Sequence, residues 1–236
     1  MSGTLLDSIP VKWSDVPIYK VSGGNKAKVG VADVLADVTP QVASDKQAWA
    51  TSRLVSTEEF LKACEGLTLV FDALQSAALD KIVKADILNN VAKLRTRFEK
   101  TPAASPTIQE LCLNEIKEKE FTATEGFVWL VRTLNFTLKA LKRSVDDEAE
   151  ELSASFKGAY QDSLAKIHNF VMRGVAMGAW GLVPYRAEFY KKLGEDQSKV
   201  KADLTAYLAD LEKFVQILRA FIESEPTIMP KKFKTF

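Results

Sequence analysis

The sequence is poor in the residues from which metal centres and disulfide frameworks are built. Its 236 residues include one histidine, His168, and two cysteines, Cys64 and Cys112. These three residues show neither a CxxC nor an HxxxH spacing, so we expect no metal site and no cofactor. Two cysteines behind a start without a basic or long apolar segment also predict a reducing, cytoplasmic compartment.

Long apolar runs and an excess of charge of one sign are missing as well. The most apolar stretch, 171–184, is short, glycine-rich and contains Arg173, so it is not expected to span a bilayer. With 32 basic and 31 acidic residues, the net charge of +1 gives no reason to expect a nucleic-acid partner. No GxSxG, HExxH or Cys-His signature is present, and we expect a protein that is not an enzyme.

The sequence does contain strong helical periodicity after residue 56. Apolar residues recur there at alternating spacings of four and three, which is typical of one buried helix face. Hydrophobic residues make up 47% of the chain, enough to bury a sizeable core. We predict an all-α body with helices beginning near 56 and 105, and others over about 79–100, 124–144, 155–180, 184–193 and 199–224.

Residues 1–45 differ from this helical body. They contain three prolines, a Gly23-Gly24 pair and a valine-rich stretch without helical periodicity. We therefore predict two regions, an irregular N-terminal extension over 1–45 and an all-α domain over 46–236.

Four polar residues follow one edge of the apolar face predicted for 79–100. Asp86, Asn90, Lys93 and Arg97 fall in one strip when the segment is helical. Their mixture of donors and acceptors suits a ligand rich in hydroxyl groups. The alternative is an intrahelical network at a solvated edge, and periodicity alone favours that alternative.

Other residues on the apolar faces also allow two interpretations each. Trp129 and Arg132 form either a platform for a flat polar ligand or a core tryptophan beside an arginine that extends into solvent. His168 lies at the edge of an apolar stripe, where a core histidine is the more common case. Trp180 is either a packing anchor or a residue at a membrane interface.

Three separated segments form a further pattern: Lys84-Ala85-Asp86-Ile87 with Asn90 and Lys93, then Trp129-Leu130 with Arg132, Leu134 and Phe136, then Ala159-Tyr160 with Leu164, His168 and Pro184-Tyr185. Their order and spacing resemble the glycolipid transfer protein family, an all-α lipid-carrier fold, over about 56–222. The resemblance implies two layers of helices that enclose a hydrophobic pocket for lipid chains, with the headgroup at its mouth.

The same resemblance implies how a glycosylated headgroup is held. Asp86 and Asn90 would hydrogen-bond sugar hydroxyls, and Asp86 would also accept from the amide N–H of the lipid. Lys93 would donate to the sugar, Trp129 would stack on its ring, and His168 would donate to the acyl-amide carbonyl. These roles are physically reasonable, because a buried amide needs both its donor and its acceptor matched.

One branch of the family carries phosphorylated ceramide and places basic residues where this chain has Asn90 and Trp129. The resemblance therefore favours a glycosylated headgroup. Arg97 and Arg132 keep the phosphate alternative open, since they could bind a phosphate or support Asp86 from behind. At position 170 the animal carriers have tryptophan, whereas this chain has Phe170 and resembles the fungal members.

The remaining expectations concern the lipid chains, the membrane and the activity. Membrane contact is predicted for Phe170, Trp180 and Tyr185. We expect a carrier that moves glycosphingolipids between membranes without covalent chemistry; a ceramide-1-phosphate carrier and a glycolipid sensor that recruits a protein partner through residues 1–45 are the alternatives. Candidate residues for the chain pocket are Phe60, Phe71, Leu74, Leu134, Phe136, Leu138, Tyr160 and Leu164.

Overall fold

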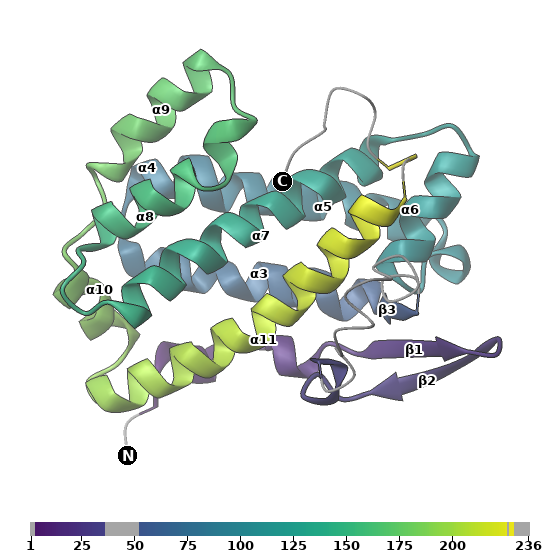
Figure 1. The fold of residues 1–236 in the computed structure, drawn as a ribbon, viewed down its shortest axis with the longest axis horizontal. Helices are drawn as coiled ribbons and strands as arrows, with labels where there is room; N and C mark the ends of the chain where they lie inside the picture. The colour runs from purple at the N-terminus through teal and green to yellow at the C-terminus, as the bar shows by residue number, and fades with distance from the viewer. Residues whose placement is uncertain (1–2, 36–51, 226, 229–236) are drawn as a thin grey trace.

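The computed structural model describes residues 3–35, 52–225 and 227–228, and these form a largely helical molecule (Figure 1). The main helices are α3 (Thr57–Leu74), α5 (Ala85–Lys100), α6 (Ile108–Lys117), α7 (Thr122–Asp146), α8 (Leu152–Gln161), α9 (Phe170–Trp180), α10 (Arg186–Leu193) and α11 (Gln197–Ser224). A short helix, α4 (Ala77–Leu79), and one π-helical turn (Asp80–Lys84) lead into α5. The predicted all-α fold class is confirmed.

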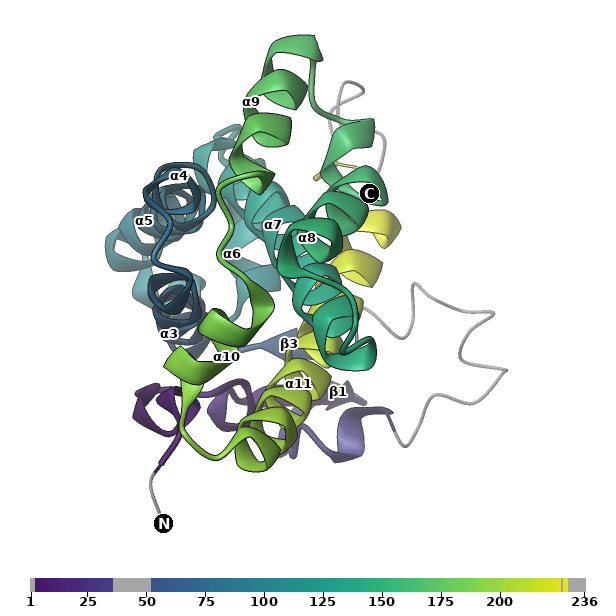
Figure 2. The same cartoon turned by 90° about the vertical axis from the view of Figure 1, so that its left-hand side faces the viewer.

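The helices form two layers, and α7 contacts helices of both. One layer contains α3, α4 and α5, and the other contains α7, α8 and α11, as Figure 2 shows from the end. Helix α7 packs on α5 across the layers and on α8 and α11 within its own layer. Its burial follows from its sequence, because it is apolar on more than one side and buries Phe127, Leu130, Leu134 and Phe136.

The prediction of one continuous helix over 155–180 is wrong, because this part of the chain forms two separate helices. Helix α8 ends at Gln161, and a 3₁₀ turn, Leu164–Lys166, precedes α9. Asn169 begins α9 as its N-cap, with its side-chain oxygen accepting from the Met172 amide at 2.9 Å. Asparagine at an N-cap competes well with a continuous helix, so the cap explains the break. The break separates His168 from both helices.

Residues 3–35 are more ordered than the sequence predicts. Strands β1 (Ile18–Ser22) and β2 (Asn25–Val29) form a hairpin, and β1 also pairs with β3 (Arg53–Val55) in the antiparallel order β2-β1-β3. Gly23 and Gly24 connect β1 to β2 with φ angles of 58° and 83°. A two-residue hairpin turn requires such positive φ angles, which explains the glycine pair.

The N-terminal segment also contributes to the hydrophobic core. Trp13 is fully buried, and its ring lies 6.0 Å from Phe60, 6.4 Å from Tyr207 and 5.6 Å from Phe214. The described part of the predicted irregular extension therefore packs on α3 and α11. The predicted boundary between residues 45 and 46 lies outside the described residues and stays a prediction.

Within the described ranges, none of the helices combines the length and apolar character needed to cross a bilayer. The apolar stretch 171–184 instead contains the short helix α9, which protrudes from one end of the two layers (Figures 1 and 2).

Replacing Trp13 with alanine is expected to destabilise the whole fold by about 3–5 kcal/mol, because it leaves a large cavity between α3 and α11. Chemical denaturation followed by circular dichroism measures the change. Phe121→Ala is the control, since Phe121 is 40% exposed. Equal stabilities of the two variants would show that the N-terminal segment does not support the core.

Candidate functional site

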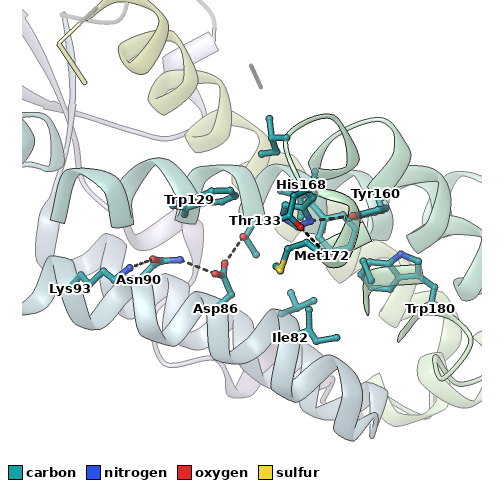
Figure 3. A pocket seen from close by; sticks show the side chains of 16 residues that line it. Ile82, Asp86, Asn90, Lys93, Trp129, Thr133, Tyr160, His168, Met172 and Trp180 are labelled. Atoms are coloured by element: carbon teal, nitrogen blue, oxygen red, sulfur yellow. Dashed lines mark hydrogen bonds between the residues drawn. The ribbon is translucent and has the colours of Figure 1, made fainter. Parts of the chain in front are cut away.

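A pocket of about 470 Å³ lies between the two layers, with residues of α5 on one side and residues of α7, α8 and α9 on the other. Figure 3 shows its polar end between α5 and α7 and its aromatic end beside α8 and α9. The structure thus brings all five residues predicted to bind the headgroup to one pocket. The lining consists of Ile82, Val83, Asp86, Asn90, Lys93, Trp129, Thr133, Phe136, Tyr160, Leu164, Ile167, His168, Asn169, Met172, Ala176 and Trp180.

A chain of hydrogen bonds runs along the polar end of the pocket. Lys93 Nζ donates to Asn90 Oδ1 at 3.1 Å, and Asn90 Nδ2 donates to Asp86 Oδ1 at 3.2 Å. Thr133 Oγ1, on α7, donates to Asp86 Oδ2 at 2.7 Å. The two interpretations of the polar strip are therefore compatible, because the intrahelical network exists and faces the pocket.

Asp86 lies in a partly desolvated environment. Burial raises the pKa of its carboxyl group above the ordinary value, while the hydrogen bonds from Thr133 and Asn90 and the charge of Lys93 act in the opposite direction. Each carboxylate oxygen accepts one hydrogen bond from the protein and has a further lone pair. The carboxylate is therefore held in place and can still accept from a ligand.

Trp129 and Arg132 form one stacked pair on α7. The guanidinium carbon of Arg132 lies 4.9 Å from the centre of the Trp129 ring. Arg132 is only 2% exposed, so the interpretation in which it extends into solvent is wrong. Burial lowers the pKa of Arg132 to about 10. Arg132 supports the indole and is not among the residues that line the pocket.

His168 enters the pocket from the turn between α8 and α9. Its Nδ1 lies 3.1 Å from the Tyr160 hydroxyl, and its ring lies 6.0 Å from the Trp129 ring. Burial, together with the charges of Arg132 and Arg173, lowers the pKa of His168 below its ordinary value. At neutral pH the imidazole is therefore uncharged.

Arg97, by contrast, faces away from this pocket. Its guanidinium forms a bidentate ion pair with Glu118, with N–O distances of 2.6 and 2.7 Å. Hydrogen bonding to Glu118 raises the pKa of Arg97, despite its burial. Lys93 is the one lysine or arginine in the pocket lining, so neither arginine considered for a phosphate lies in it.

Three of the residues predicted for the lipid-chain pocket, Phe136, Tyr160 and Leu164, line the cavity, and their contact with a lipid chain stays a prediction. Five other residues predicted for the chain pocket are buried in the core and do not line this cavity, so the structure gives them no place in it. Periodicity identifies buried residues, but the side chains on the opposite layer decide which of them border a cavity. The five residues are Phe60, Phe71, Leu74, Leu134 and Leu138.

The prediction that Trp180 contacts a membrane is also wrong. Trp180 is only 3% exposed and its ring lies 5.3 Å from Phe136, 5.8 Å from Phe156 and 5.6 Å from Tyr160. Trp180 is therefore part of the aromatic wall of the pocket. Phe170 and Tyr185 are 90% and 72% exposed, and their contact with a membrane stays a prediction.

Sequence reasoning missed Thr133 and the polar role of Tyr160. Thr133 lies four residues after Trp129, on the same face of α7, and that spacing is a signal that could have identified it. Nothing in the sequence indicates that the Tyr160 hydroxyl meets His168. Further lining residues that were not anticipated are Ile82, Val83, Ile167, Asn169, Met172 and Ala176.

The fold and the pocket together define a two-layer helical protein with a ligand pocket between its layers. The family model described as glycolipid transfer protein matches residues 55–195. A glycolipid transfer protein of Aureobasidium melanogenum is 44% identical over 171 residues, which cover 72% of this chain and 85% of the relative. The chain therefore belongs to the glycolipid transfer protein family.

Solved structures agree with this assignment. The crystal structure of HET-C2, a fungal glycolipid transfer protein, superposes with a TM-score of 0.76 at 37% identity, covering 98% of this chain and all of HET-C2. The mouse ceramide-1-phosphate transfer protein has a TM-score of 0.67 at 16% identity, with 84% of this chain and 96% of that one covered. The second likeness shows a shared fold alone.

Replacing Thr133 with valine is expected to raise the pKa of Asp86 further. The Thr133 hydroxyl stabilises the charged carboxylate, so its loss favours the protonated form. Carboxyl carbon NMR over an acidic pH series measures the titration of Asp86. Thr137→Val, on the same helix but outside the pocket, is the matched control. An Asp86 titration that does not move in Thr133→Val would contradict this account.

Proposed function

We propose that this protein binds glycosphingolipids in the pocket and carries them between membranes without covalent chemistry. The observation that carries the proposal is the juxtaposition of a hydrogen-bonding end, formed by Asp86, Asn90 and Lys93, with an aromatic and aliphatic interior. Such a pocket matches a molecule with a sugar at one end and hydrocarbon chains at the other.

In this proposal the sugar occupies the end of the pocket beside Trp129. The indole offers a flat apolar surface to the C–H face of the sugar ring. Asp86 and Asn90 accept and donate hydrogen bonds to the hydroxyls, and Lys93 donates another. The fixed Asp86–Asn90–Lys93 network reduces the ordering cost of binding, because these side chains are already held.

The linkage of the lipid lies between the sugar and the chains. Asp86 accepts from the amide N–H, and the neutral His168 donates to the acyl carbonyl. The hydrocarbon chains enter the apolar part of the pocket beside Phe136, Leu164 and Trp180. Burial of each CH₂ contributes ~0.8 kcal/mol, which explains why a lipid of this kind needs a protein to cross water.

A phosphorylated ceramide fits these residues less well. Two phosphate charges would require several strong donors, and Lys93 supplies the one permanent cation of the lining. Arg97 is engaged with Glu118, and Arg132 lies behind Trp129. The 37% identity to a fungal glycolipid transfer protein, against 16% to a ceramide-1-phosphate carrier, supports the same choice.

The sensor alternative depends on a protein partner that binds residues 1–45. Deletion of this segment does not test the alternative cleanly, because Trp13 and its neighbours belong to the core. Replacing the exposed lysines of the hairpin, Lys26 and Lys28, is a milder test. A sensor would lose partner recruitment and retain lipid transfer.

We further propose that the protein works in the cytosol and meets the membrane through α9. This helix and the loop after it expose a group of large apolar side chains. They are suited to insertion among lipid headgroups because they are apolar and exposed, and one of them, Met172, also lines the pocket. The residues are Phe170, Val171, Met172, Val175, Met177, Leu182 and Tyr185.

Asp86→Val is expected to lower the affinity for glycosylceramide by about tenfold or more, because a hydrogen bond to a charged group contributes ~1.5–3 kcal/mol. A vesicle transfer assay with fluorescent glucosylceramide, ceramide-1-phosphate and phosphatidylcholine measures the effect. Asp146→Val, at the exposed end of α7, is the matched control.

Selective transfer of glucosylceramide by the wild type is required, with the lipid recovered chemically unchanged. Transfer of ceramide-1-phosphate alone would overturn the proposed headgroup. Loss of helical signal in Asp86→Val would mean that this carboxylate serves the fold.

Phe170→Ser is expected to weaken association with vesicles by about tenfold or more, because Phe170 no longer buries an apolar ring in the bilayer. Sedimentation with vesicles measures association. Binding of a glycosylceramide presented in detergent should be retained, since Phe170 does not line the pocket. Phe121→Ser, another exposed phenylalanine, is the control. If both variants bound vesicles like the wild type, α9 would not be the membrane contact.

A further inference from the structure

The hydroxyl of Tyr160 is a polar group in the otherwise aromatic wall of the pocket. Tyr160 is almost fully buried on α8, and its ring packs against Phe136 and Trp180. Among the described residues, His168 Nδ1, at 3.1 Å, is the acceptor that the structure provides for this hydroxyl (Figure 3). A buried O–H that does not donate a hydrogen bond is costly, so the hydrogen is directed at Nδ1.

This direction decides where the imidazole carries its own hydrogen. A neutral imidazole has one N–H, and the other ring nitrogen is an acceptor. Burial and the charges of Arg132 and Arg173 keep His168 neutral, and burial raises the pKa of Tyr160 so that the phenol keeps its hydrogen. With Nδ1 accepting from Tyr160, the hydrogen of His168 lies on Nε2.

The backbone of His168 is held from both sides as well. Its N–H donates to the Leu164 carbonyl at 2.9 Å, and its carbonyl accepts from Arg173 Nε at 3.0 Å. The ring lies 5.7 Å from the Tyr160 ring and 6.0 Å from the Trp129 ring. The main-chain bonds, the neighbouring rings and the hydroxyl together leave the imidazole little freedom, which is the condition for a directed donor.

We propose that Tyr160 is a positioning residue that fixes His168 in the tautomer with hydrogen on Nε2, so that the pocket offers a donor to the carbonyl of an N-acyl lipid. The inference rests on the proposed function and adds a residue to it. With Asp86 as the acceptor, the pocket then complements both polar groups of a secondary amide. In the opposite tautomer, Nε2 would be an acceptor and would repel the carbonyl oxygen.

The tautomer can be measured directly, because His168 is the single histidine of the chain. Long-range proton–nitrogen NMR on protein with isotope-labelled histidine distinguishes the two ring nitrogens. In the lipid-free wild type we expect one tautomer, with hydrogen on Nε2. In Tyr160→Phe we expect signals averaged over both tautomers. Hydrogen on Nδ1 in the wild type, or identical spectra for the two proteins, would overturn the inference.

A double-mutant cycle tests whether Tyr160 acts on the lipid through His168. Tyr160→Phe retains the ring and removes only the hydroxyl, and we expect it to lower the affinity for glucosylceramide about three- to tenfold. In a His168→Leu background the same change should have no further effect, because the hydroxyl then has no imidazole to orient. Equal losses in both backgrounds would show that the Tyr160 hydroxyl acts independently of His168 and would contradict the proposal.

Tyr190→Phe is the matched control, because Tyr190 is another buried tyrosine whose hydroxyl lies 3.2 Å from Ser144 and outside the pocket. It should leave affinity and tautomer unchanged. The design also separates two failures. If the wild type binds no glycosylceramide, the proposed function is overturned. If the wild type and Tyr160→Phe bind it equally tightly, this inference alone is overturned.

Discussion

The hydrogen bond between Thr133 and Asp86 connects the two helical layers at the point where the pocket begins. Asp86 belongs to α5 and Thr133 to α7, and their contact crosses the partly buried interface between these helices. A carboxylate in such an interface is costly unless hydrogen bonds compensate for lost water. The Asp86 network therefore bridges the layers here, and it leaves an acceptor open to the pocket.

The same principle extends along the rest of the polar rim. Each polar side chain is held by a protein neighbour and keeps some hydrogen-bonding capacity, as Asn90 does between Lys93 and Asp86. Side chains that are already oriented lose little entropy when a ligand arrives. Trp129 follows this pattern with its stacked arginine, Arg132. The pocket is preorganised by local contacts on α5 and α7.

The N-terminal segment and helix α9 differ in how deeply their side chains are buried, and this difference matches the separate roles proposed for them: support of the core and contact with a membrane. The N-terminal segment closes the core through Trp13, far along the chain from the pocket. Helix α9 exposes Phe170 to solvent on one side and places Trp180 in the pocket wall on the other. A helix with few buried residues and many exposed apolar ones links the interior of the pocket to the surface proposed to meet a bilayer.

The amino-acid sequence by itself determined the helical class, most helix positions and the strip of Asp86, Asn90 and Lys93, because the spacing of apolar residues within one helix is a local property. It also carried the family resemblance.

Only the tertiary structure decided that Arg97 turns to Glu118, that Trp180 is buried, and that Phe60 and Phe71 lie outside the pocket lining. The contacts of Thr133 with Asp86 and of Tyr160 with His168 also depend on the fold, since α7 crosses α5 and the chain turns after α8. Such contacts between elements depend on how helices pack, and periodicity along one helix does not encode them.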